Sequence, residues 1–159
     1  MRSWFETRVH PIGVARRFVL AIAGLLVTGL TFHSWIAVGL VGRGDDFIRS
    51  GSPKRAIVYF ERAALFDPTW QVPVERVGFV VMLLGDPVWY RKEIEIATRH
   101  LARHPRDANI RWDRAVAYLH LQDRDAAYRD IALIAREAPA NREMRDIAIR
   151  LAARIQGRL

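Results

Sequence analysis

Two histidines come closest to a catalytic or metal-binding pattern in this sequence. His100 and His104 are four residues apart, which places both imidazoles on one face of a helix, as a site with two metal ligands requires. The segment lacks the glutamate of the HExxH motif, and no third ligand lies beside it. We therefore interpret both histidines as solvated residues near a helix C-terminus, where a cationic imidazole is favoured, and we expect no metal and no cofactor.

The remaining residue types predict no catalytic site. The serines lie in no nucleophile-like motif, and the glycines form no phosphate-binding loop. The absence of cysteine excludes both disulfides and thiolate metal sites. We therefore expect a protein that is not an enzyme.

Small and aromatic residues recur at fixed intervals in the stretch from Gly44 to Pro68, GDDFIRSGSPKRAIVYFERAALFDP. This stretch resembles a tetratricopeptide repeat, a unit of two helices in which small residues let the helices touch, large residues fill the seam and a proline ends the second helix. The residues that carry the resemblance are Gly44, Phe47, Gly51, Ala56, Phe60, Ala63 and Pro68. The resemblance implies an all-α fold that is specialised for binding.

Two further units of the same kind follow along the chain. The second carries Gly78 and Gly85, and the third carries Ala115, Tyr118 and Ala127. Pro68 and Pro105 are 37 residues apart, whereas Pro105 and Pro139 are 34 apart, and we place the three surplus residues in a long turn over residues 86–90. A final helix after Pro139, apolar on one face and rich in arginine on the other, is expected to cap the stack.

An uncharged run over residues 18–42 precedes the repeats. A helix of 25 residues is roughly 37 Å long, enough to cross a hydrocarbon layer of about 30 Å. We predict a transmembrane helix that enters the bilayer here and continues into a short α-solenoid of about three helix pairs. The expected domains are an interfacial segment at 1–17, the membrane helix at 18–42 and the repeats at 43–159. A cleaved secretory signal is the alternative for the apolar run.

The charges beside this run favour one orientation in the membrane. Arg16 and Arg17 lie directly before it, whereas Asp45 and Asp46 follow it beside Arg43. By the positive-inside rule the N-terminus is then cytoplasmic and the repeats are periplasmic. Of the 25 basic residues only Lys54 and Lys92 are lysines, a bias typical of GC-rich bacterial genomes, so we expect a bacterial inner-membrane protein.

The resemblance also implies a binding surface, because the first helices of successive repeats line a concave groove in that family. The positions that correspond to the groove are Val72, Glu75, Phe79, Met82, Asn109, Trp112, Val116 and Leu119. This surface is mostly apolar and lacks the lysine and asparagine pattern that clamps a terminal carboxylate, so we predict that it binds an amphipathic helix or an apolar segment. In the alternative interpretation, Phe79 and Trp112 are buried between helices. Trp89 and Tyr90, on the long turn, form a second candidate contact; in the alternative interpretation they face the membrane or belong to the core.

These features favour a membrane-anchored adaptor or scaffold that binds another protein and so assembles or stabilises a membrane or cell-envelope complex. One alternative is a permanent structural subunit of an oligomeric membrane complex, and another is a metal or haem protein with histidine ligands. The net charge of +8 is interleaved with acidic residues, which is typical of solvated helix faces. Because no compact basic run is present, the sequence argues against nucleic-acid binding.

Overall fold

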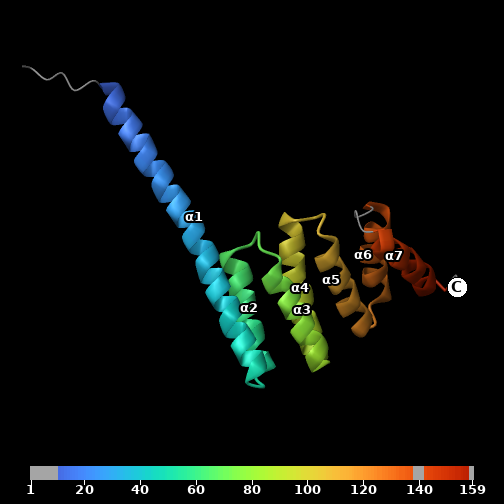
Figure 1. Cartoon of the computed structure of the whole chain (residues 1–159). Coiled ribbons are helices and arrows are strands. Elements are labelled where there is room, and N and C mark those ends of the chain that lie inside the picture. Colours follow the sequence, from blue (N-terminus) through green and yellow to red (C-terminus); the bar gives the residue numbers. More distant parts are fainter. Residues whose placement is uncertain (1–10, 138–141, 158–159) are drawn as a thin grey trace, which may run out of the picture.

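The computed structural model describes residues 11–137 and 142–157, without the side chains of residues 11–18 and 24–31. Within these residues the chain is all helical and contains no strand (Figure 1). The helices are α1 (Pro11–Arg49), α2 (Pro53–Phe66), α3 (Val72–Leu84), α4 (Pro87–Arg103), α5 (Ala108–His120), α6 (Arg124–Glu137) and α7 (Arg142–Ile155). The prediction of an all-α protein is confirmed.

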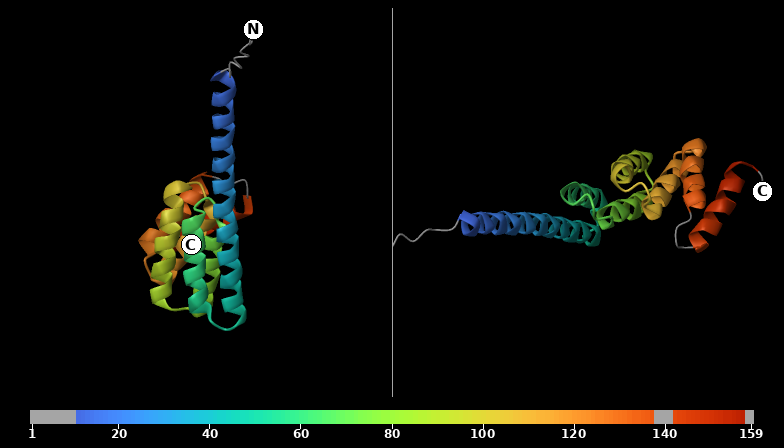
Figure 2. Two further views of the ribbon diagram at one scale, coloured as in Figure 1. Left: turned by 90° about the vertical axis from the view of Figure 1, so that its left-hand side faces the viewer. Right: turned by 90° about the horizontal axis from the view of Figure 1, so that it is seen from above.

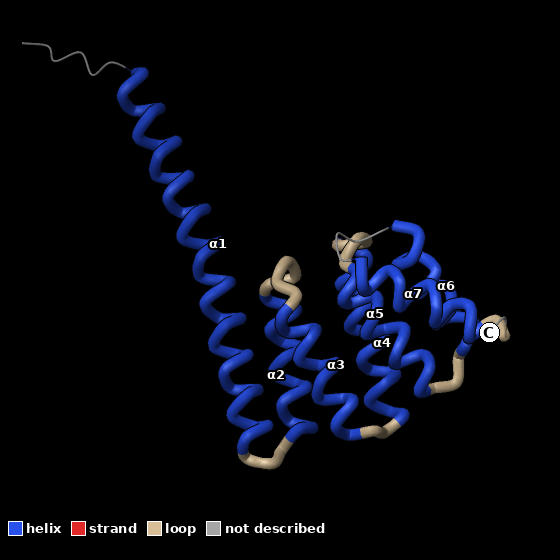
Figure 3. Tube along the Cα trace, turned by 45° about the vertical axis from the view of Figure 1, so that its right-hand side comes forward, coloured by secondary structure: helices blue, strands red, loops and turns tan. Residues whose placement is uncertain are grey.

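The helices are stacked as neighbouring pairs. α1 packs on α2, α3 on α4 and α5 on α6, while α7 packs on α6 at the end of the stack (Figures 1 and 3). Successive pairs are joined through contacts of α2 with α3 and of α4 with α5. The first helices of neighbouring pairs, α3 and α5, carry the residues of the predicted groove and also touch directly.

Helix α1 is much longer than the others and is not confined to the stack. Its 39 residues make a rod of roughly 58 Å, and its N-terminal half stands clear of the other helices (Figures 1 and 2). Residues 11–17 of the predicted interfacial segment belong to this helix. A proline is tolerated in a first helical turn, and Pro11 is therefore compatible with the start of α1. Residues 1–10 of the predicted interfacial segment lie outside the described residues.

The predicted transmembrane helix is not supported by the described part of the chain. No helix there has a stretch that is both long enough and apolar enough to cross a membrane. The predicted span of residues 18–42 includes residues 18 and 24–31, whose side chains lie outside the description.

Close packing of α1 on α2 depends on a glycine. A methyl group added at Gly44 would overlap the ring of Phe60, with the Cδ1 atom of that ring only 2.8 Å away. Phe60 is fully buried, as are Ala56 and Ala63 one turn to either side of it. The small residues thus bring the backbones together and the large ring fills the seam, as the repeat pattern predicts.

Helix α4 corrects the predicted position of the three surplus residues. It has 17 residues, whereas α2 and α6 have 14 each, so the surplus extends the helix and not the turn. The helix begins at Pro87 because the Asp86 carboxylate accepts a hydrogen bond from the Val88 amide at 2.9 Å, which caps the first turn. Gly85, with φ of +62°, ends α3 in the left-handed conformation that glycine adopts most readily.

The buried apolar residues form two clusters. The larger cluster joins α1 to α5 and includes Phe60, Val77 and Ile110. The smaller joins α5 to α7 around Ile131 and Ile134, with Ala148 of α7 packed on them. The stack therefore has two cores that meet at α5.

Candidate functional site

The predicted groove residues all remain accessible to a partner. They come from α3 and α5, and each is either exposed or half-buried. Phe79 is 48% exposed and Met82 55% exposed. We call this set the α3/α5 face, and its members are Val72, Glu75, Phe79, Met82, Asn109, Trp112, Val116 and Leu119.

Trp112 lies at the border between this face and the second core. It is half-buried and packs against the cluster that α6 and α7 share. A pocket of about 270 Å³ opens beside it, lined by Trp112, Glu143, Met144 and Ile147. Met144 and Ile147 lie on α7, the predicted capping helix, and the sequence gave no sign that they would meet Trp112. The pocket can take an apolar side chain of a partner.

Three carboxyl groups interact where α3, α4 and α5 meet, and one of them, Glu75, belongs to the α3/α5 face. Glu93 of α4 is only 4% exposed, and its Oε1 atom would lie 2.9 Å from a Cβ atom on Gly78. The Oδ2 atom of Asp113, on α5, would be 3.5 Å from the same point. The charge of Glu75, on α3, acts on Asp113. We call Glu75, Glu93 and Asp113 the acidic trio.

Burial makes these carboxyl groups hard to ionise. Desolvation, followed by the charge of Asp113, raises the pKa of Glu93 to about 8. Desolvation likewise raises the pKa of Asp113 to about 6, with smaller contributions from Glu75 and Asp107. At neutral pH Glu93 therefore keeps its proton while Asp113 is mostly ionised.

The nearby basic residues form ion pairs with acidic residues outside the trio. Arg76 pairs with Asp45 of α1 at 3.8 Å. Elsewhere the pairs are Lys92 and Arg99 with Glu61 at 2.8 and 2.7 Å, and Arg114 and Arg111 with Asp130 at 2.7 and 3.6 Å. Over the described residues, no ion pair reaches any member of the acidic trio. The trio therefore lacks a cation from this part of the chain.

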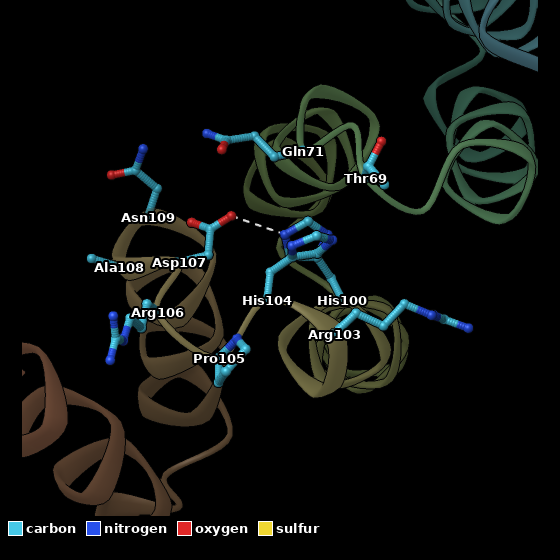
Figure 4. A pocket seen from close by; sticks show the side chains of 10 residues that line it. All are labelled: Thr69, Gln71, His100, Arg103, His104, Pro105, Arg106, Asp107, Ala108 and Asn109. Carbon is cyan, nitrogen blue, oxygen red and sulfur yellow. Dashed lines mark hydrogen bonds and ion pairs between the residues drawn. The ribbon is translucent and has the colours of Figure 1, made fainter. Parts of the chain in front are cut away.

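The two histidines lie at a separate pocket of about 600 Å³ (Figure 4). There the C-terminus of α4 and the N-terminus of α5 meet the segment that connects α2 to α3. The Nε2 atom of His100 is 2.9 Å from Oδ2 of Asp107, and Nε2 of His104 is 3.1 Å from the carbonyl oxygen of Pro68. The centroids of the two imidazole rings are 4.7 Å apart. These contacts join three segments of the backbone.

The interpretation of His100 as a solvated residue is wrong. It is only 6% exposed, because α4 continues to Arg103 and Asp107 folds back over it. Asp107 also caps α5 by accepting a hydrogen bond from the Ile110 amide at 3.1 Å, so it serves both helices. Arg103 and Arg106 point away from the histidine–aspartate pair in Figure 4. The arrangement is that of a structural clamp, and within the described residues no group of His, Asp and Glu is placed to hold a metal ion.

Trp89 and Tyr90 do not form an exposed aromatic turn. Both belong to the first turns of α4, where Tyr90 is 4% exposed and stacks on His120 with ring centroids 4.4 Å apart. Trp89 is half-buried against the larger core. The hypothesis that these residues form a second contact surface is therefore wrong for Tyr90.

Comparison with known proteins identifies a fold and no family. No protein-family profile matches the sequence, and no curated protein is significantly similar to it. Among solved structures, the chain is similar to the crystal structure of PcrH in complex with the chaperone binding region of PopD. The TM-score is 0.59 with 17% identity, over 76% of this chain and 90% of that one. This likeness confirms a helical-repeat fold.

Proposed function

We propose that this protein is an adaptor that binds an apolar segment of another protein on its α3/α5 face and that performs no catalysis. The observation that carries the proposal is the exposure of Phe79 and Met82 on α3, a helix that touches α5, which carries Trp112 and its pocket. Large apolar side chains gathered on one face of a folded chain are typical of a site that binds protein. The similar PcrH structure contains a bound protein segment, which agrees with this use of the fold.

Site-directed photo-crosslinking in the native host tests the proposal. A photoreactive phenylalanine analogue at Met82 is expected to yield an adduct of one defined mass. The matched control carries the analogue at Arg129, an exposed residue of α6 outside the α3/α5 face, and is expected to yield none. A second substitution, Phe79→Asp, should remove the adduct because it places a charge in the apolar contact. Equal crosslinking from both positions would contradict the proposal.

We further propose that α1 attaches the adaptor to the bacterial inner membrane. The support is the absence of charge over residues 18–42 together with the exposed apolar side chains of α1. These exposed residues are Val19, Leu20, Ile22, Phe32, Trp35 and Val38. Apolar side chains without cover on a projecting helix suit contact with lipid.

Membrane flotation after an alkaline wash tests this attachment independently of the groove. We expect the full chain to float with the lipid, and a variant with Leu20→Asp and Ile22→Asp to float less, because charges are costly in hydrocarbon. Recovery of the wild-type protein from the wash would contradict attachment and leave the α3/α5 face untouched. A partner that co-purifies in fixed stoichiometry through mild detergent would instead favour a permanent subunit.

A further inference from the structure

The acidic trio is a second feature of the α3/α5 face, and its charge is not balanced. Glu75 lies on the same side of α3 as Phe79 and Met82, at spacings of four and seven residues. Asp113 follows Trp112 directly on α5. Carboxylate oxygens and exposed apolar side chains thus lie on the same two helices, α3 and α5, which touch each other.

Within the trio, Asp113 is mostly ionised at neutral pH, whereas Glu93 keeps its proton. Glu93 is 4% exposed, yet no hydrogen bond or ion pair joins it to another group in the described residues. Buried carboxyl groups are normally paired, since desolvation without a partner is unfavourable. Glu75 accepts one hydrogen bond, from Gln71 at 2.6 Å, and that donor is uncharged.

Basic residues of the stack do not correct this imbalance. The chain has 25 basic and 17 acidic side chains, so cations are in excess overall. Those nearest the trio pair with Asp45, Glu61, Glu95 and Asp130 instead. The chain has surplus arginine, yet it leaves Glu75 and Asp113 without an ion pair beside exposed apolar side chains, and this surface is complementary to an incoming cation.

We propose that the partner segment carries a lysine or arginine, which pairs with Glu75 and Asp113 while neighbouring apolar side chains of the segment pack on Phe79, Met82 and the pocket at Trp112. This inference rests on the proposed function and adds the chemistry of the partner. The trio is not placed as a metal site, because within the described residues no group of side chains is arranged to hold a metal ion. A cationic side chain held among apolar ones fits both features.

Selection from a random displayed library of 16-residue peptides tests the inference without knowledge of the natural partner. The bait is the full-length protein in mild detergent. The enriched peptides are expected to combine two or three large apolar residues with a lysine or arginine at a constant spacing from them. The same selection against Glu75→Gln combined with Asp113→Asn should enrich the apolar residues without the basic one. The control bait carries Asp125→Asn and Glu137→Gln, which alter exposed acids elsewhere, and should reproduce the wild-type result.

Affinity measurements on one selected peptide give the decisive comparison. Replacing its basic residue with glutamine should weaken binding to the wild-type protein by about tenfold, the effect of losing one charge-assisted contact. The same replacement should change binding to the double variant by less than about twofold, because the acids that it pairs with are gone.

The other outcomes are distinguishable. Apolar peptides that are selected without any basic preference, yet compete with one another and are lost in Phe79→Asp, would overturn the inference and leave the proposed function standing. Failure to select any peptide that depends on Phe79 would overturn both. Self-association of the protein that disappears in the double variant would identify a second copy of this chain as the occupant and would also overturn the inference.

Discussion

At the scale of single residues, Glu93 couples the stability of the fold to pH. Its pKa is about 8 in the folded chain, against an ordinary value of 4.5 for an exposed glutamate. Between these two values the unfolded chain releases the proton while the folded chain retains it. Folding stability is therefore full below about pH 4.5 and falls by about 1.4 kcal/mol for each pH unit up to about 8.

Glu93→Gln should remove this dependence. Glutamine is nearly isosteric with the protonated carboxyl group and has no proton to release. We expect the variant to match the wild-type protein near pH 5 and to be more stable near pH 8.5, by a few kcal/mol at most. Urea unfolding at the two pH values measures the difference.

Glu95→Gln is the control for this substitution. It lies on the same helix, but its side chain is 56% exposed in its ion pairs with Lys92 and Arg99. Its effect should be below about 1 kcal/mol and should not grow between pH 5 and 8.5. An equal gain at both pH values for Glu93→Gln would mean that the glutamate is not protonated in the fold.

The sequence predicted where these residues lie but not how they behave. The repeat pattern usually has alanine at the positions of Glu93 and His100, so both residues are exceptions to it. Their partners, Asp113 and Asp107, belong to the next helix pair, and only the packing of that pair shows that one carboxyl group lacks a cation while one imidazole gains an acid. Spacing along one helix carries no such information.

At the scale of helix pairs, close contact between α1 and α2 requires that residue 44 be glycine, which has no side chain. Gly44→Ala should lower the free energy of unfolding by about 1–3 kcal/mol, because the added methyl group overlaps the buried Phe60 ring. Gly42→Ala, two residues earlier on the same helix, meets no atom within 4 Å and should stabilise the protein by up to about 1 kcal/mol through helix propensity. Thermal unfolding followed by circular dichroism compares the two. A stabilising Gly44→Ala would show that α1 and α2 are not in close contact.

The third helix pair is held by a buried acid. Asp130 of α6 is 3% exposed and accepts two hydrogen bonds from the Arg114 guanidinium, at 2.8 and 2.7 Å. Asp130→Asn should cost about 3–5 kcal/mol, since it leaves buried guanidinium groups without a counter-charge. Asp46→Asn breaks an exposed pair with Arg49 and should cost less than about 1 kcal/mol. Similar losses in urea unfolding for both variants would contradict the importance of burial.

Helix lengths were less predictable than helix identity. The spacing of small residues predicted which segments pair, because this spacing follows directly from the contact between two helices. The sequence did not reveal that α4 absorbs three extra residues, since DPVWY can form a turn or a capped helix start equally well. The Asp86 cap and the burial of Tyr90 decide between them, and both depend on neighbouring helices.

At the scale of the whole molecule, the two cores should unfold separately. Contacts in a helical stack are mainly between neighbours, so each core is stabilised locally. Hydrogen exchange should show lower protection in α6 and α7, which share the smaller core, than in α2 and α3. Removing the whole of α7, from residue 142 onward, should reduce protection in α6 further because it uncovers Ile131 and Ile134. Uniform protection over α2 to α7 would indicate one cooperative unit.

The overall arrangement follows from the repeat resemblance, whereas the binding surface follows only in part. Phe79 and Met82 are exposed, as a groove position requires, whereas Trp112 is half-buried against the second core. The binding role of all three residues stays a prediction. The pocket beside Trp112 depends on where α7 docks. Sequence alone could not place a terminal helix whose apolar stripe fits several positions along the stack.

The continuity of α1 has a geometrical consequence. One helix supplies both the projecting rod and the first wall of the stack, and it runs from Pro11 to Arg49 without a joint. Each residue turns an α-helix by about 100°, so inserting one residue between Ile22 and Phe32 would rotate the outer end by that angle relative to Met82 and its neighbours. The number of residues in α1 therefore determines how its outer end is oriented, about the helix axis, relative to the rest of the molecule.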